Sequence, residues 1–167
     1  MSNVTTLLDA KSVPEAKAAL VCPSRNETYS YKKLRDEMNR IGLGLLTLGV
    51  RKGDRVCIYL DSSPEYLISY FALWRIGAVA VPTNIVYKGE ELLHVLNDAG
   101  AIAVITDRQG AGVIGSIRKD APTVSHLICT GGTCDGSVAW ESFPPAPENM
   151  RAANCSTMDL CHIQYTA

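Results

Sequence analysis

The sequence predicts an α/β domain with three layers, in which helices flank a mostly parallel sheet and a small N-terminal β-hairpin precedes it. Residues 53–84 follow the order strand, helix, strand, which is the βαβ unit that builds parallel sheets. Residues 102–106 (IAVIT) are a continuous apolar run, which is typical of a strand covered on both faces. Helical periods and short apolar runs alternate around these two stretches, as an α/β fold requires.

The chain opens with a polar segment, a hairpin and an amphipathic helix. Residues 1–16 are polar and contain the breaker Pro14, so we expect them to be loosely ordered, with one helical turn at most. Residues 19–31 hold two short strand-like runs around a turn-rich loop, which predicts a β-hairpin. Ser30 can cap the next helix, and Gly49 can end it. Its apolar face recurs at steps of four and three: Leu34, Met38, Ile41, Leu45 and Leu48.

The strand–helix–strand unit has local signals at each boundary. Arg55–Leu60 is short, apolar and rich in β-forming residues, so we expect a strand. Ser62 or Ser63 offers an N-cap oxygen for a helix over Pro64–Ile76, where proline suits the first position. This helix is apolar on nearly every side, which predicts burial. Gly77 can end it in the left-handed conformation.

The remaining elements continue the alternation of strands and helices. Ala78–Val81 is the second strand of the unit, and Pro82 keeps it from extending as a central strand. The elements expected after it are a loop over 83–88, a helix over 90–99, a strand over 102–106, a weaker helical segment to about Asp120, and a strand over 124–129.

The last part of the chain lacks a regular pattern. Six glycine and proline residues between 130 and 157 prevent any long element, so we expect an irregular surface connection there. Residues 159–165 (DLCHIQY) are a further strand candidate, after which the chain stops at Thr166-Ala167. A strand normally leads into a turn or a helix. We therefore interpret 17–167 as a single but incomplete α/β domain, part of a larger one.

Composition and charge exclude several classes of protein. A net charge of −1 gives no electrostatic reason to expect a nucleic acid or an anionic membrane as partner. The longest apolar run is too short to span a bilayer. The N-terminus lacks the features of a secretory signal, which favours the cytoplasm. None of the six cysteines forms a C-x-x-C pair, so we expect thiols, including buried ones at Cys57 and Cys129, rather than a disulfide framework.

One formal motif points to a nucleotide. Gly110–Gly115 (GAGVIG) is a G-x-G-x-x-G that follows a strand and opens a helical segment. A small, complete nucleotide-binding module is therefore one hypothesis. Two observations oppose it: the first glycine lies several residues past the strand, and the next strand ends in Thr130-Gly131 without an acid for a ribose hydroxyl. A glycine-rich start of a surface helix is the alternative.

Five blocks of the sequence, taken in order, carry a family resemblance. They are YSYKKL at 29–34, GDRV at 53–56, ALWRIGAVAVP at 72–82, Asn84 with EEL at 90–92, and QYTA at 164–167. These blocks resemble the adenylate-forming (AMP-binding) superfamily of acyl-CoA synthetases, luciferases and peptide-synthetase adenylation domains. The closing QYTA is similar to the first residues of the family's phosphate loop, Y-T-[SA]-G-T-T-G-x-P-K-G. The third block fits the acyl-CoA synthetase branch better than a peptide-synthetase adenylation domain, which stays as an alternative.

The resemblance implies an activity for a longer parent protein. That enzyme would bind ATP, Mg²⁺ and a small carboxylic acid, form an acyl-adenylate, and pass the acyl group to coenzyme A. Backbone N–H groups of the glycine-rich loop would wrap the phosphates. The resemblance carries over Thr166 and Ala167 as cofactor-binding positions at the start of this loop. It also carries over Lys88 as a basic loop residue near the coenzyme A phosphates, where a solvated surface charge is the alternative.

Most of the family's machinery falls outside this sequence. The loop's glycines and lysine, the adenine and ribose contacts and the catalytic lysine of the C-terminal domain would all follow Ala167. We therefore expect no catalytic or metal-binding residue here, no tight binding of ATP, Mg²⁺ or coenzyme A by the fragment, and no ligase activity from it alone. An open sheet edge and apolar surface that the missing part would cover predict self-association of the fragment.

Overall fold

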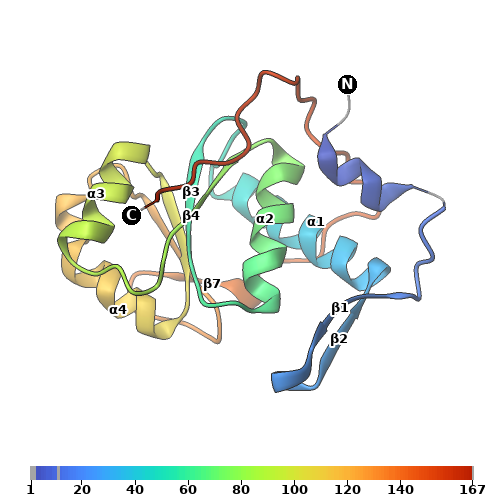
Figure 1. The fold of residues 1–167 in the computed structure, drawn as a ribbon, viewed down its shortest axis with the longest axis horizontal. Helices are drawn as coiled ribbons and strands as arrows, with labels where there is room; N and C mark the ends of the chain where they lie inside the picture. Colours follow the sequence, from blue (N-terminus) through green and yellow to red (C-terminus); the bar gives the residue numbers. More distant parts are fainter. Residues whose placement is uncertain (1–2, 11, 167) are drawn as a thin grey trace.

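The chain forms one parallel sheet with helices on both faces, and a separate hairpin (Figure 1). The computed structural model describes residues 3–10 and 12–166. The sheet order is β4-β3-β5-β6-β7, and each neighbouring pair of strands is parallel. The strands are β3 (Arg55–Tyr59), β4 (Val79–Pro82), β5 (Ala103–Thr106), β6 (His126–Cys129) and β7 (Val138–Ala139).

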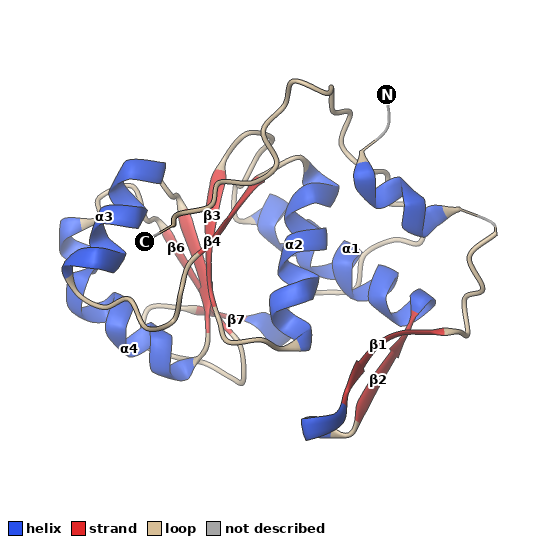
Figure 2. Cartoon of the chain, viewed as in Figure 1, coloured by secondary structure: helices blue, strands red, loops and turns tan. Residues whose placement is uncertain are grey.

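Two pairs of helices make the outer layers (Figure 2). On one face are α1 (Tyr31–Thr47) and α2 (Pro64–Ile76), and on the other are α3 (Glu90–Ala99) and α4 (Arg108–Ile117). Successive side chains of a strand point to opposite faces of the sheet. In β3, Val56 and Ile58 therefore pack with α1 and α2, whereas Cys57 and Tyr59 pack with α3 and α4. The predicted three-layer α/β class is confirmed.

The βαβ unit has the boundaries that its sequence predicts. The Ser63 hydroxyl accepts the Tyr66 N–H at 3.1 Å and caps α2. Pro64 occupies the first helical position, and Gly77 ends the helix with a φ of +76°. The expectation that α2 is buried on all sides is wrong for its outer face: four aromatic side chains there, Tyr66, Tyr70, Phe71 and Trp74, are only half-buried.

The N-terminal elements pack onto the α1 and α2 layer. The first, η1 (Val4–Asp9), is a 3₁₀-helix in which Thr5 is fully buried. The predicted hairpin is confirmed: β1 (Ala18–Cys22) and β2 (Glu27–Ser30) are antiparallel, joined by a 3₁₀ turn, η2 (Pro23–Arg25). Ser30 caps α1 by accepting the Lys33 N–H at 3.2 Å.

The segment after β6 is irregular, but it is not confined to the surface. It adds the short strand β7 and a 3₁₀ turn, η4 (Trp140–Ser142), and it buries the rings of Trp140 and Phe143 against the core. The Arg40 guanidinium of α1 donates to the carbonyl oxygens of both residues, at 2.8 and 3.3 Å. Glycine and proline residues keep the backbone of this segment irregular. The buried side chains of Trp140 and Phe143 fix its position against the core.

Two predictions from the sequence are wrong: a free thiol at Cys129 and a full strand over residues 159–165. Cys129 is paired with Cys134 in a disulfide, so it is not a thiol. The expected strand over 159–165 is reduced to a single parallel bridge between His162 and Ala80 of β4. The ladder stops there because Pro82 has no N–H to donate to the next carbonyl of the partner segment. No helix of the described residues is long and apolar enough to cross a bilayer.

We expect Gly44→Ala to destabilise the fold by about 2 kcal/mol, because a methyl group there would overpack the core. A Cβ on Gly44 would lie 2.3 Å from the Phe143 ring. Gly112→Ala is the matched control, since a Cβ on that α4 residue meets nothing within 4 Å. It should stabilise the protein by up to about 1 kcal/mol through helix propensity. Urea unfolding measures both, and equal effects would contradict the packing of Phe143 on α1.

Candidate functional site

The sheet has a topological switch point between β3 and β5. From β3 the chain runs through α2 to β4, and it then returns through α3 to β5 on the opposite side of β3. In open parallel sheets, ligands bind in the crevice outside the carboxyl ends of the strands at such a point. A ligand-binding site is therefore expected at this edge of the sheet.

A small crevice of 110 Å³ lies at this point, and we call it the switch crevice. It is built from the ends of β3 and β5, the loop after β4 and the first turns of α4. Its lining residues are Tyr59, Asp61, Ile85, Lys88, Asp107, Gln109, Gly110 and Val113. The sequence-predicted Lys88 thus lines a crevice at the switch point that Asp61 and Asp107 also line.

Tyr59 fixes the loop that carries Lys88. Its hydroxyl lies 2.9 Å from the Ile85 carbonyl oxygen and 2.7 Å from the Tyr87 carbonyl oxygen. Burial raises the pKa of this hydroxyl, which keeps it a neutral donor. The Lys88 N–H donates to the Glu91 carboxylate at 3.3 Å, while the Lys88 side chain is exposed at the mouth of the crevice.

The charges of the switch crevice are mixed. Lys88 supplies one cation, and Asp61 and Asp107 supply two carboxylates. Asp107 is already engaged, because its carboxylate accepts the Gly110 N–H at 2.7 Å and caps α4. A phosphate group here would be attracted by one lysine and repelled by two aspartates. The crevice can contribute a single ammonium contact to an anion, and it does not form a complete phosphate site.

The glycine motif is explained by packing. Gly110–Gly115 lies inside α4, so its backbone N–H groups are directed along the helix and not at a ligand. A Cβ on Gly110 would lie 1.9 Å from the Thr106 hydroxyl oxygen, which itself donates to the Tyr59 carbonyl at 2.8 Å. Gly112 is exposed with open space around it. The nucleotide-module hypothesis is therefore wrong: Gly110 is small so that α4 can approach the sheet.

A second cleft, of 680 Å³, opens at the same edge of the sheet. Here the hairpin meets α2: the Arg25 guanidinium donates to both Glu65 carboxylate oxygens at 2.8 Å. Burial would raise the pKa of Glu65, but the hydrogen bonds and the charge of Arg25, together with hydrogen bonds from the Glu65 backbone and Ser63, hold that pKa below its ordinary value of 4.5. Sequence reasoning missed this pair, because forty positions separate its members and no local pattern links them.

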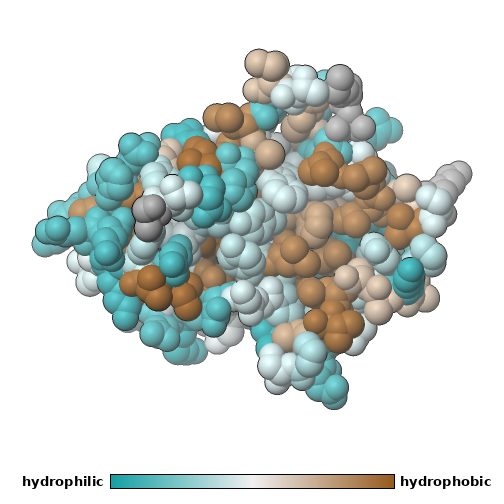
Figure 3. Space-filling model, viewed as in Figure 1, coloured by the Kyte–Doolittle hydropathy of each residue, from teal (hydrophilic) through white to brown (hydrophobic). Residues whose placement is uncertain are grey.

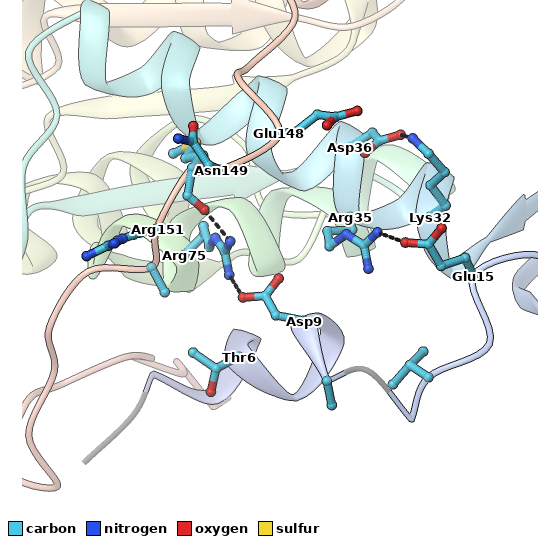
Figure 4. A pocket seen from close by; sticks show the side chains of 14 residues that line it. Thr6, Asp9, Glu15, Lys32, Arg35, Asp36, Arg75, Glu148, Asn149 and Arg151 are labelled. Atoms are coloured by element: carbon cyan, nitrogen blue, oxygen red, sulfur yellow. Dashed lines mark hydrogen bonds and ion pairs between the residues drawn. The ribbon is translucent and has the colours of Figure 1, made fainter.

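A further cavity, of 880 Å³, lies between η1, α1 and residues 148–152 (Figure 4). Arg75, 3% exposed, forms an ion pair with Asp9 at 2.5 Å, and Arg35 and Lys32 are each paired with a carboxylate of their own. Because each of these positive charges is neutralised by its own carboxylate, the cavity offers little attraction to a nucleotide phosphate.

The other sequence-predicted site residues lie at the C-terminus. Thr166 is exposed next to Tyr165, whose hydroxyl donates to the Asp98 carboxylate of α3 at 2.5 Å. Ala167 falls outside the described residues. Within the described part of the chain, no hydrogen bond or ion pair joins Thr166 to Lys88. The structure places the two candidates on different elements and does not bring them into contact.

Over 3–10 and 12–166, no group of three or more His, Cys, Asp or Glu side chains is placed to hold a metal. Mg²⁺ prefers octahedral oxygen coordination that includes carboxylates. The described residues therefore form no all-protein metal site, and a Mg²⁺ ion bound with ATP would take most of its oxygen ligands from phosphates and water.

The fold and its sequence define the class of the protein. Residues 9–167 match the family of AMP-binding enzymes, and the chain belongs to that family. Its similarities lie in the acyl-CoA ligase branch. It is 32% identical to a crotonobetaine/carnitine–CoA ligase of Escherichia coli O127:H6, over 95% of this chain and 32% of the ligase. The chain thus spans about a third of the length of that relative.

Solved structures of CoA ligases share the same fold. An anthranilate CoA ligase in complex with anthranoyl-AMP superposes with a TM-score of 0.91 at 28% identity, over 99% of this chain and 32% of that one. A Mycobacterium tuberculosis fatty acyl CoA synthetase gives 0.85 at 29% identity, again over 99% and 32% of the two chains. This chain therefore corresponds to the N-terminal portion of an acyl-CoA-ligase-like enzyme.

The Arg25–Glu65 contact predicts a pH dependence of stability. Because the folded-state pKa of Glu65 is lowered, the contact stabilises the fold above pH 4.5, and this stability is lost as the pH falls through the folded-state pKa. We expect Glu65→Gln to lower the free energy of unfolding at neutral pH, by an amount that shrinks in acid. Urea unfolding at a series of pH values tests this.

Arg25→Met removes the same contact from the hairpin side but leaves the half-buried Glu65 carboxylate unpaired, so its loss of stability at neutral pH should be at least as large and should also shrink in acid. A difference between wild type and Glu65→Gln that grows toward acid pH would contradict this account.

Proposed function

We propose that this chain is the N-terminal part of an ATP-dependent acyl-CoA synthetase that acts in the cytoplasm on a small carboxylic acid. A carboxylate oxygen would attack the α-phosphorus of ATP, and pyrophosphate would leave. The sulfur of coenzyme A would then attack the acyl carbon of the adenylate, and AMP would leave. The match of nearly the whole chain to CoA ligases carries this proposal.

The role proposed for these residues is that of a scaffold. Residues 164–167 (QYTA) would begin the phosphate loop, which puts Thr166 and Ala167 next to the phosphates of ATP. Backbone N–H groups and the lysine that follow them in the family pattern would supply most of the contacts. Lys88, exposed at the switch crevice, would meet the phosphates of coenzyme A. Mg²⁺ would be held by ATP phosphates and by residues beyond this chain.

The first test compares this chain with the longer protein. We expect the purified 167-residue chain to show no carboxylate-dependent exchange of pyrophosphate into ATP, because the phosphate loop is incomplete in it. The gene is expected to continue past Ala167 with the remaining G-T-T-G-x-P-K-G, and its full product should catalyse the exchange. Exchange by the short chain, or a stop codon directly after Ala167, would contradict the proposal.

Lys88 is tested in the same longer protein. Lys88→Ala should leave acyl-adenylate formation unchanged and raise the KM for coenzyme A about fivefold, as expected for one exposed charge contact. Lys119→Ala removes a comparable exposed lysine and should change neither step. An equal effect of both substitutions would favour a solvated surface charge at Lys88.

We also propose that the fragment self-associates through the outer face of α2. Tyr66 and Phe71 are only half-buried there, beside Tyr70 and Trp74, which contact the C-terminal segment. Figure 3 shows hydrophobic residues gathered on the side of the molecule that carries α1 and α2. The two thirds of the relatives' length that this chain does not span are not available to cover it. A second copy of the chain is the proposed occupant.

Sedimentation velocity over a wide concentration range tests the self-association. We expect the average mass to rise with concentration, and Phe71→Glu to shift the fragment toward monomer. Val86→Glu is the control, since Val86 is 66% exposed in the loop after β4, apart from this face. A wild-type chain that stays monomeric throughout would contradict the proposal.

A further inference from the structure

The C-terminal segment, 159–166, lies along the outer edge of β4 (Figure 1). The Ala80 N–H donates to the Cys161 carbonyl at 3.0 Å, and the Ile163 N–H donates to the Ala80 carbonyl at 2.9 Å. Pro82 has no N–H with which to continue this ladder. Two backbone hydrogen bonds do not offset the conformational entropy lost when such a segment is ordered. Its position therefore depends on side-chain contacts.

Helix α2 supplies those contacts on one face of the sheet. The Trp74 indole N–H donates to the Cys161 carbonyl at 2.9 Å. Together with the Ala80 N–H, it occupies both lone pairs of that oxygen. The His162 ring stacks on the Tyr70 ring, with centroids 5.7 Å apart and planes 16° apart. Tyr70 in turn packs edge-on against Trp74, with centroids 5.3 Å apart. A ladder of aromatic rings on α2 thus holds the backbone of the segment.

Helix α3 holds the segment from the opposite face. Ile163 and Tyr165 pack against Val81 and Val95, and the Tyr165 hydroxyl donates to the Asp98 carboxylate. Side chains alternate along extended backbone, so residue 162 points to α2 while 163 and 165 point to α3. Contacts with α2 on one face and with α3 on the other fix the register of the segment against β4 and the direction in which the chain leaves the sheet.

Trp74 is suited to positioning and not to core packing. Its side chain is half-buried on the outer face of α2, whereas Ile68, Ala72 and Leu73 of the same helix fill the core. The loss of its N–H would leave the sheet and its helices in place. Its effect would be confined to the segment whose carbonyl it holds.

We propose that Trp74, supported by Tyr70, is a positioning residue for the phosphate-binding loop. The proposal rests on the function proposed above, in which Tyr165 and Thr166 begin that loop. Trp74 does not touch ATP. It anchors the carbonyl of Cys161, so that the residues after Thr166 start from a fixed point at the edge of β4.

Hydrogen exchange of the present chain tests the anchoring. Trp74→Phe keeps a ring beside Tyr70 and removes the indole N–H. We expect the Ile163 amide to exchange about tenfold faster in this variant, while the amide of Ile105 in β5 keeps its rate. Tyr66→Phe is the matched control: it removes a hydroxyl 3.2 Å from the Tyr70 hydroxyl and should leave the exchange of Ile163 unchanged. Unchanged exchange of Ile163 in Trp74→Phe, or an equal loss of protection at Ile105, would overturn the proposal.

Kinetics of the longer protein test the consequence. Trp74→Phe should lower kcat/KM for ATP about tenfold, the expected effect of one lost hydrogen bond, with the KM for the carboxylic acid unchanged. Tyr66→Phe should match the wild type. Equal kcat/KM values for ATP in Trp74→Phe and wild type would overturn the role of Trp74. A wild-type longer protein that forms no adenylate would refute the proposed function instead, and the exchange experiment would still decide whether Trp74 anchors the segment.

Discussion

The packing of α2 between the parallel sheet and α1 is the interaction on which the other segments depend. The helix buries Ile68, Ala72 and Leu73 in the core shared by α1 and the strands. Its polar and aromatic side chains then anchor four distant parts of the chain. Glu65 binds the hairpin through Arg25, and Arg75 binds η1 through Asp9 and residues 148–152 through the Met150 carbonyl. Trp74 binds the C-terminal segment through the Cys161 carbonyl. One helix therefore sets the position of both ends of the described chain.

Arg75 shows the cost of this arrangement. A guanidinium that is 3% exposed loses most of its hydration, and breaking such a pair leaves a buried charge without compensation. Its Nη atoms donate to Asp9 and to the Met150 carbonyl, but its Nε has no hydrogen-bond partner among the residues that the structure describes. The residue lies in the last turn of α2, where the helix dipole favours a cation. The charge is thus held by two long-range contacts and by the helix end, and all three require the native packing.

Local signals in the sequence were sufficient for the hairpin, for β3 to β6 and for α1 to α4, but not for β7 or for the long-range contacts. A serine, a proline and a glycine fix both ends of α2, so its bounds could be predicted residue by residue. The burial of Trp140 could not, because it lies in a stretch bounded by glycines and prolines, such as Gly136 and Pro144, that is typical of a surface loop. For the site, the sequence could name Lys88 and Thr166 through a family resemblance. Only the strand order shows that Lys88 lies at the switch crevice, and only the packing of α4 explains the spacing of its glycines.

Under the proposed function, the chain would provide a scaffold whose sheet edge presents the start of a phosphate loop, and residues of the longer protein would complete the chemistry. The most direct test is a crystal structure of the longer protein bound to a non-hydrolysable acyl-adenylate analogue. We expect the phosphate of the analogue to contact backbone N–H groups just after Thr166, with His162 still paired to Ala80 at the edge of β4. An analogue bound at the start of α4, or a C-terminal segment detached from β4 in the complex, would contradict this account.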